Sequence, residues 1–133
     1  MVITLRSNGA DFAIETTLST RSYVQTIRRA RALGYTVTLV FVYLSSPEVA
    51  VEGVAKRVAA GGHNIPEAVI RRRYDRALHN LLTLYIPVCD YFIVLNNGEE
   101  AVIEVAAGGL GEETVVFDLD CWTQIMNHDG YSE

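Results

Sequence analysis

The sequence predicts an α/β protein in which strands and helices alternate along one compact domain. Short β-branched or apolar runs alternate with segments of helical periodicity, and half of the 133 residues are hydrophobic, enough to form one core. We expect a three-layer, mostly parallel sheet with right-handed crossovers and antiparallel additions at the C-terminus. Residues 1–133 are interpreted as a single domain.

The first elements are two strands separated by a helix. Residues 12–15 form a short strand candidate, and residues 21–33 have helical spacing that Gly34 ends. Residues 36–44 (TVTLVFVYL) are almost continuously β-branched, aromatic or apolar. Such a run is typical of a strand covered on both faces, so we expect it at the sheet centre.

Two helices follow. Ser46 before Pro47 is an N-cap signal for a helix that runs to about residue 60, where two glycines end it. Pro66 begins the next helix, and Pro87 ends it. The buried stripe expected on this second helix consists of Ile70, Tyr74, Ala77, Leu78, Leu81, Leu82 and Tyr85.

The C-terminal part contains further strands and a short helix. Residues 91–95 are a strand candidate, residues 96–98 (NNG) a turn signal, and residues 101–105 a strand that pairs back as a hairpin. Residues 114–117 and a helix over about 120–126 complete the pattern. Cys89 and Cys121 lack metal-ligand spacing and have apolar neighbours, which favours buried, reduced thiols.

The charge is divided along the chain. Residues 1–76 contain all eleven basic residues and six acidic ones, a balance of +5, whereas residues 77–133 contain ten acids and no Lys or Arg, a balance of −10. The acidic half argues against general nucleic-acid binding and favours a local site for a small anion. No apolar run is long enough for a membrane span or signal peptide, so we expect a cytoplasmic protein with no membrane partner.

Two motifs carry a family resemblance. Residues 12–19 (FAIETTLS) and 61–81 (GGHNIPEAVIRRRYDRALHNL) resemble the zeta-toxin-like branch of P-loop kinases, and the resemblance extends over about residues 12–97. It implies a P-loop-kinase-like fold and ATP-dependent phosphorylation of a small molecule, by family analogy a peptidoglycan sugar nucleotide. Glu15 and Thr17 match the acceptor-binding pattern. The alternative for Glu15 is an ion pair with a nearby arginine.

The resemblance also implies a phosphate-binding lid. Arg57, Arg73, Arg76 and His63 match positions that face the nucleotide phosphates, and guanidinium groups bind phosphate oxygens bidentately. Two ordinary explanations stay open: pairing of Arg71 with Glu67 or of Arg72 with Asp75, and a surface role for the histidine. The sequence departs from the family at Gly53, where relatives tend to have arginine, and at Asn96-Asn97, where they often have Asp-Asn.

The phosphate loop itself is missing from the sequence. No GxxxxGK[ST] motif occurs, and Lys56, the only lysine, lies in a helical pattern. We therefore interpret the chain as a truncated or degenerate kinase domain without catalytic residues of its own and without a cofactor. ATP and Mg²⁺ enter only if a preceding segment supplies the loop, which would make the whole an ATP-dependent kinase. A homo-oligomeric binding module is the other alternative, and an antitoxin partner stays open.

The missing first strand of the kinase fold leads to one topological prediction. Residues 2–5 (VITL) are β-branched and apolar, and the Ser7-Asn8-Gly9 turn can fold them back beside residues 12–15. We expect this segment to replace the missing central strand in the opposite direction. Otherwise an open edge would pair with a second chain, and a homodimer is expected in either case.

Overall fold

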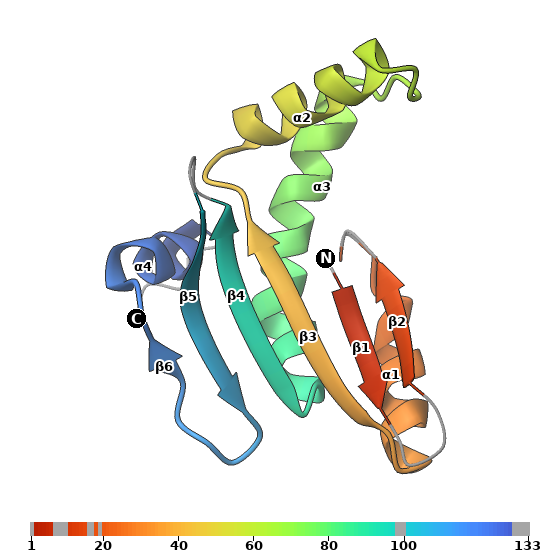
Figure 1. Ribbon diagram of the computed structural model, residues 1–133, viewed down its shortest axis with the longest axis vertical. Helices are drawn as coiled ribbons and strands as arrows, with labels where there is room; N and C mark the ends of the chain where they lie inside the picture. Colours follow the sequence, from red (N-terminus) through yellow and green to blue (C-terminus); the bar gives the residue numbers. More distant parts are fainter. Residues whose placement is uncertain (1, 7–10, 16–17, 19, 98–100, 129–133) are drawn as a thin grey trace.

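The computed structural model describes residues 2–6, 11–15, 18, 20–97 and 101–128. In this part of the chain six strands form one sheet in the order β2-β1-β3-β4-β5-β6 (Figure 1). The strands are β1 (Val2–Arg6), β2 (Asp11–Glu15), β3 (Thr36–Tyr43), β4 (Tyr91–Asn97), β5 (Val102–Gly109) and β6 (Val115–Val116). The helices are α1 (Tyr23–Ala32), α2 (Pro47–Ala59), α3 (Glu67–Asn80) and α4 (Leu119–His128).

The sheet is mixed, and the expectation of a mostly parallel sheet was wrong. Between the described strands only β3 and β4 pair in parallel, while the other four pairs are antiparallel. The parallel pair is joined through α2 and α3, as a crossover requires. The α/β class is confirmed, but antiparallel strands adjoin this pair on both sides.

Strand β1 lies where the sequence predicted a replacement strand. It pairs antiparallel with β2, where Ile3 is opposite Ile14, and antiparallel with β3, where Ile3 is opposite Leu39. The prediction of an inserted, reversed strand is therefore confirmed. The turn proposed at Ser7-Asn8-Gly9 lies outside the described residues.

Local signals account for the helix boundaries. The Ser46 side chain accepts a hydrogen bond of 3.3 Å from the Val49 amide, and Pro47 is the first residue of α2. Helix α3 continues into a π-helical turn, Leu81–Tyr85, and a 3₁₀ turn, Ile86–Val88. The buried stripe predicted for α3 is confirmed, with Tyr74 and Leu82 partly buried and the other five members buried.

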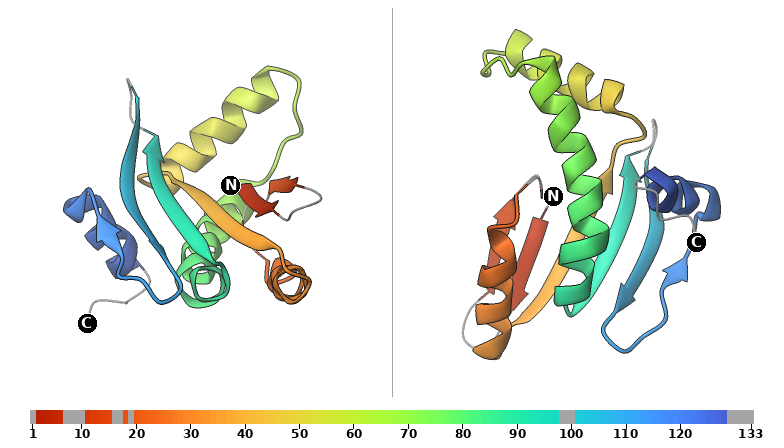
Figure 2. Two further views of the ribbon diagram at one scale, coloured as in Figure 1. Left: turned by 60° about the horizontal axis from the view of Figure 1, so that its bottom comes forward. Right: turned by 180° about the vertical axis from the view of Figure 1, so that it is seen from behind.

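The helices that contact the sheet pack on one face of it. Side chains of β3 and β4 on that face are buried, among them Leu39, Phe41 and Phe92. Helix α4 lies on the same side, because its Trp122 stacks on Phe92 with ring centroids 6.4 Å apart and α4 contacts α3. Figure 1 looks onto the other face, with α1 and α3 behind the strands, and Figure 2 shows these helices from behind. In the described part, the expected three-layer arrangement was therefore wrong.

Both cysteines are free and buried in the helix-covered side of the structure, as the sequence predicted. Burial raises the pKa of the Cys89 thiol to about 12, and it also raises the pKa of Cys121. The described helices include none that is long and apolar enough to cross a membrane.

Candidate functional site

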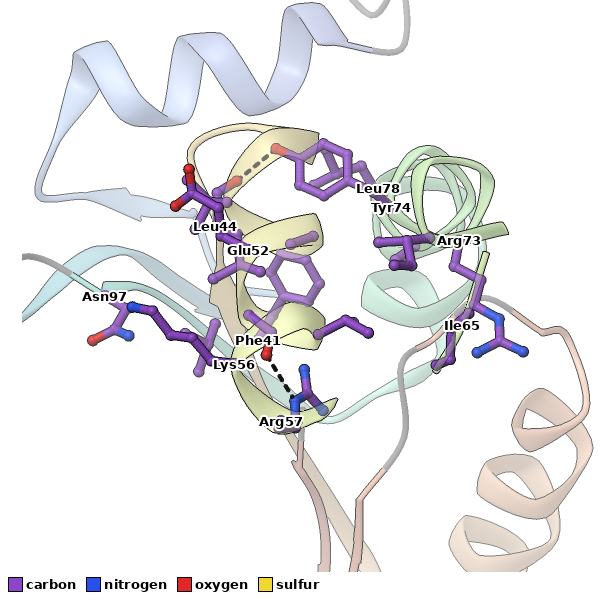
Figure 3. Close-up of a pocket in the computed structure, with 17 residues that line it drawn as sticks. Phe41, Leu44, Glu52, Lys56, Arg57, Ile65, Arg73, Tyr74, Leu78 and Asn97 are labelled. Atoms are coloured by element: carbon purple, nitrogen blue, oxygen red, sulfur yellow. Dashed lines mark hydrogen bonds between the residues drawn. The ribbon is translucent and has the colours of Figure 1, made fainter. Parts of the chain in front are cut away.

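A cavity of about 540 Å³ lies between α2 and α3 at the carboxyl ends of β3 and β4 (Figure 3). Its walls include Phe41 and Leu44 from β3 and the loop after it, and Ile70 and Leu78 from α3. Strands β2, β3 and β4 all point toward this end of the sheet (Figure 1). Carboxyl ends of parallel strands are where α/β sheets hold their ligands.

Three cationic side chains line the cavity. Arg57 comes from the last turn of α2, Arg73 from the middle of α3, and Lys56 from the residue before Arg57. Among the described residues of the lining, Glu52 is the one acidic group, which leaves these residues a formal charge of +2. Figure 3 shows the two guanidinium groups separated from each other and from Glu52, with Lys56 extending toward Asn97. The described lining therefore presents positive charge to a ligand.

Arg57 forms a hydrogen bond within its own helix, and no described carboxylate pairs with Arg57 or Arg73. Nε of Arg57 donates to the Gly53 carbonyl at 3.4 Å, a bond within α2. In the described part of the chain, neither Arg57 nor Arg73 forms a salt bridge. Both side chains are exposed at the mouth of the cavity, so their N–H groups are available to an anionic ligand.

Tyr74 forms part of the wall and fixes the end of β3. Its hydroxyl donates to the Leu44 carbonyl at 2.5 Å. Burial, followed by a hydrogen bond with Tyr43, holds the pKa of Tyr74 above its ordinary value, so the phenol stays protonated and remains a donor. The sequence predicted Tyr74 only as a member of the buried stripe.

An ion-pair network joins the two helices that form the cavity. Nη1 of Arg71 lies 3.0 Å from Oε1 of Glu48 on α2, and Nε of Arg71 lies 3.5 Å from Oε2 of Glu67 on its own helix. The hydrogen bond from Arg71 is the largest cause of the lowered pKa of Glu48. The predicted Arg71–Glu67 pair is therefore confirmed, whereas Asp75 pairs with His128 of α4 at 2.8 Å rather than with Arg72.

The predicted lid residues divide into two groups. Arg57 and Arg73 share the cavity, but Arg76 and His63 do not line it. Arg76 is exposed on α3 and His63 is exposed in the connection between α2 and α3. Their predicted contact with phosphate stays a prediction. The described residues include no group of three or more His, Cys, Asp or Glu side chains placed to hold a metal ion.

The predicted acceptor-binding segment follows β2. Glu15 is the last residue of β2, with its backbone opposite Val2, and Thr17 lies outside the described residues. Just beyond, Leu18 is buried and has a φ of 56°, a left-handed conformation that is uncommon for a residue with a branched side chain. The part of the segment that the structure describes is therefore tightly constrained.

Two polar side chains form hydrogen bonds to the backbone of this segment, one from the end of α3 and one from the π-helical turn that follows it. The Asn80 amide donates to the Leu18 carbonyl at 2.7 Å, and the Tyr85 hydroxyl donates to the Thr20 carbonyl at 2.7 Å. Asn80 is buried, and burial raises the pKa of Tyr85. Neither role was predicted from the sequence. The only available signal was a polar Asn80 within an otherwise apolar stripe.

Lys56 and Asn97 are further site residues that sequence analysis missed. The sequence excluded Lys56 as a phosphate-loop lysine but gave it no other role, and it noted the Asn96-Asn97 pair only as a departure from the family. Both side chains line the cavity. Their adjacency depends on how α2 crosses the ends of β3 and β4, which helical spacing alone does not define.

The fold and this site define an α/β domain with a cationic cavity at the carboxyl ends of its parallel strand pair. Comparison with known families gives the class a name: the zeta toxin family model matches residues 2–104, and the chain belongs to this family. A protein of Haemophilus influenzae (strain ATCC 51907 / DSM 11121 / KW20 / Rd) described as uncharacterized is 33% identical over 63 residues. That match covers 47% of this chain and 45% of the length of the relative. No solved structure matches.

Proposed function

We propose that this zeta-toxin-family domain binds a phosphorylated small molecule in the cavity between α2 and α3 and does not itself transfer phosphate. The observation that carries the proposal is the joint presence of Arg57 and Arg73 in the wall of one cavity. Guanidinium groups from two helices can bind different oxygens of the same phosphate or diphosphate. A volume of about 540 Å³ also suits a small-molecule ligand.

The lining supports a ligand with both an anionic and an apolar part. Among the described residues of the lining, the cationic groups Lys56, Arg57 and Arg73 outnumber the carboxylate of Glu52, and the remaining walls are largely apolar. A sugar nucleotide or a nucleotide has this combination of phosphate charge and ring surface. The family resemblance favours a sugar nucleotide of peptidoglycan synthesis.

We propose that the chain does not transfer phosphate because its sequence lacks a phosphate loop. The 133-residue sequence contains no GxxxxGK[ST] motif, and its one lysine belongs to α2. Catalysis of phosphoryl transfer depends on backbone amides, a lysine and a Ser/Thr–Mg²⁺ contact that together position the phosphates. The place between β2 and β3 is moreover occupied by β1. A phosphate-loop strand entering there would have to displace it.

Family membership favours one alternative. Phosphorylation of a sugar nucleotide by ATP and Mg²⁺ would use the same cavity if a phosphate loop came from residues outside this sequence. Glu15 and Thr17 would then be the acceptor-binding residues, and Arg76 and His63 would join Arg57 and Arg73 on the phosphates. Phosphate transfer by the 133-residue chain alone would contradict our proposal.

Ligand titrations test the proposal. Inorganic phosphate, ATP and a peptidoglycan-precursor sugar nucleotide are titrated into isotopically labelled protein, and amide shifts are followed by NMR. We expect shifts around residues 53–57 and 70–78, and binding that weakens about tenfold or more in Arg57→Gln and Arg73→Gln. Arg72→Gln is the matched control, because Arg72 is exposed on the same helix and does not line the cavity. The proposal would be overturned if Arg57→Gln and Arg73→Gln bound the ligands as tightly as Arg72→Gln, or if the amide shifts were confined to other residues.

A further inference from the structure

We propose that Gly53 is a binding residue of the cavity, where its missing side chain lets a phosphate group of the ligand lie against helix α2 beside the guanidinium of Arg57. Gly53 is the central residue of α2 and lines the cavity. This assignment rests on the proposed function, and it adds to that function a position that determines which ligands fit.

The packing of α2 gives no reason for glycine at this position. Glycine is, after proline, the least favourable residue in the interior of a helix. Among the described residues, a Cβ atom added at Gly53 would meet only Nη2 of Arg57, at 3.8 Å, which is an ordinary van der Waals distance. Alanine would therefore fit into the folded chain without a clash and would form the helix better.

The other described glycines each have a local reason to be glycine. Three have a positive φ, which other residues rarely adopt: Gly34, Gly61 and Gly111. In three more, an added Cβ would lie 2.8 Å or less from another atom: Gly62, Gly108 and Gly109. Within the described chain, Gly53 alone has neither feature, and it borders the cavity. The space that a side chain would fill there is therefore space available to a ligand.

The side chain of Arg57 folds back along α2 toward this space. Its Nε donates to the Gly53 carbonyl at 3.4 Å (Figure 3). This bond uses one of the five N–H groups of the guanidinium, and no described residue accepts from the other four. A methyl group at position 53 would contact Nη2 and cover part of the guanidinium, and a longer side chain would cover more of it. Glycine keeps this side of Arg57 open.

The open side of Arg57 suits a phosphate. Guanidinium groups bind phosphate oxygens through pairs of parallel N–H groups, so the edge that carries these groups must be free of other side chains. Lys56 and Arg73 line the same cavity and add positive charge. We therefore place one phosphate of the ligand beside Gly53 and Arg57, and its apolar part against walls such as Phe41 and Leu44.

A series of side-chain sizes at position 53 tests this placement. Inorganic phosphate and ATP are titrated into the full chain, and binding is followed by NMR for the parent, Gly53→Ala and Gly53→Leu. We expect the affinity for both ligands to fall in that order, by about threefold in Gly53→Ala and about tenfold or more in Gly53→Leu. Thermal unfolding verifies that each variant is folded, and Gly53→Ala decides the outcome if Gly53→Leu does not fold.

Ala55→Leu is the matched control, because Ala55 is exposed on α2 and does not line the cavity. It should bind both ligands as the parent does. Binding as tight as that of the parent in the folded Gly53 variants would overturn the placement. Weaker binding in Ala55→Leu by the same factor would also overturn it, because the effect would then belong to the helix as a whole.

A double-mutant cycle with Arg57→Gln identifies the contact. Gly53→Leu should weaken binding less in the Arg57→Gln background than in the parent, because the phosphate contact with Arg57 is already lost. Equal losses in both backgrounds would overturn the placement beside Arg57. Weaker binding by Arg57→Gln with unchanged binding by Gly53→Leu would overturn this inference alone, whereas absence of ligand binding by the parent chain would overturn the proposed function as well.

Discussion

The Asn80 amide donates a 2.7 Å hydrogen bond to the Leu18 carbonyl, joining α3 to the segment that follows β2 across 62 positions of the sequence. Leu18 has a left-handed backbone, and Asn80 is a buried polar residue. The bond therefore fixes an otherwise unfavourable conformation from inside the protein. It also sets the path of the chain just beyond Glu15, the predicted acceptor residue.

Replacing Asn80 by Leu should destabilise the protein by about 1–3 kcal/mol, because the Leu18 carbonyl loses its amide donor in a buried place. Urea unfolding followed by circular dichroism measures the change. Thr83→Ala is the control, since the Thr83 hydroxyl bonds the His79 carbonyl within the same helical segment and its loss should cost little. Equal stability of Asn80→Leu and the parent would show that the bond contributes nothing.

Tyr85→Phe should cost about 1 kcal/mol with little change in packing, since only the hydroxyl that donates to the Thr20 carbonyl is lost. Because Asn80 and Tyr85 hold the same segment, the double variant should lose less than the sum of the two single losses. A double-mutant cycle in urea measures this coupling. Strict additivity would indicate that the two bonds act independently.

Much of the fold was predictable from local signals. The reversed β1 followed from the β-branched residues 2–5, and α2 from the Ser46-Pro47 start signal. The sheet was misjudged because the composition of β3 reports that both faces prefer burial but not what covers them. In the described chain one face is covered by helices and the other is open.

The site was predictable where motif and helix agreed, and not where it depended on distant contacts. Arg57 and Arg73 were found because both helices were placed correctly. Lys56 was missed because its neighbour in the cavity, Asn97, is 41 positions away, and helical periodicity carries no information about such contacts. The Asn80–Leu18 bond was missed for the same reason.

Gly53→Ala should stabilise the protein by about 0.5–1 kcal/mol. Gly53 lies inside α2, where alanine is the better helix former, and an added Cβ would lie 3.8 Å from a terminal nitrogen of Arg57, an ordinary contact. Gly62→Ala is the contrasting variant, because its Cβ would lie 2.8 Å from the Arg57 carbonyl oxygen and should destabilise. Thermal unfolding of both distinguishes these signs, and a lower melting temperature for Gly53→Ala would contradict the argument.

Helix α4 should depend on Trp122 far more than on His128. The Trp122 ring stacks on Phe92 with an interplanar angle of 18°. Trp122→Ala therefore exposes a core residue and should lower the free energy of unfolding by about 2 kcal/mol. The His128–Asp75 pair has side chains 28% and 64% exposed, and His128→Ala should cost less than about 1 kcal/mol. Urea unfolding compares the two variants. A larger loss in His128→Ala would show that the ion pair anchors the helix.

The protein should lose stability in alkaline solution, chiefly through Cys89. Burial raises the pKa of this thiol to about 12, from an ordinary value of 9.0, and burial also raises the pKa of Tyr43, Tyr74 and Tyr85. Between these two pH values the unfolded chain releases the thiol proton while the folded chain keeps it, so the free energy of unfolding falls as pH rises. At about pH 10.5 the contribution of Cys89 is a loss of about 2 kcal/mol.

Urea titrations at about pH 8 and about pH 10.5 should show a smaller decrease in the free energy of unfolding for Cys89→Ala than for the parent. Cys121→Ala serves as the control, because its thiol is less deeply buried. Stability that is constant from about pH 8 to about pH 10.5 would contradict the burial of Cys89 as a neutral thiol.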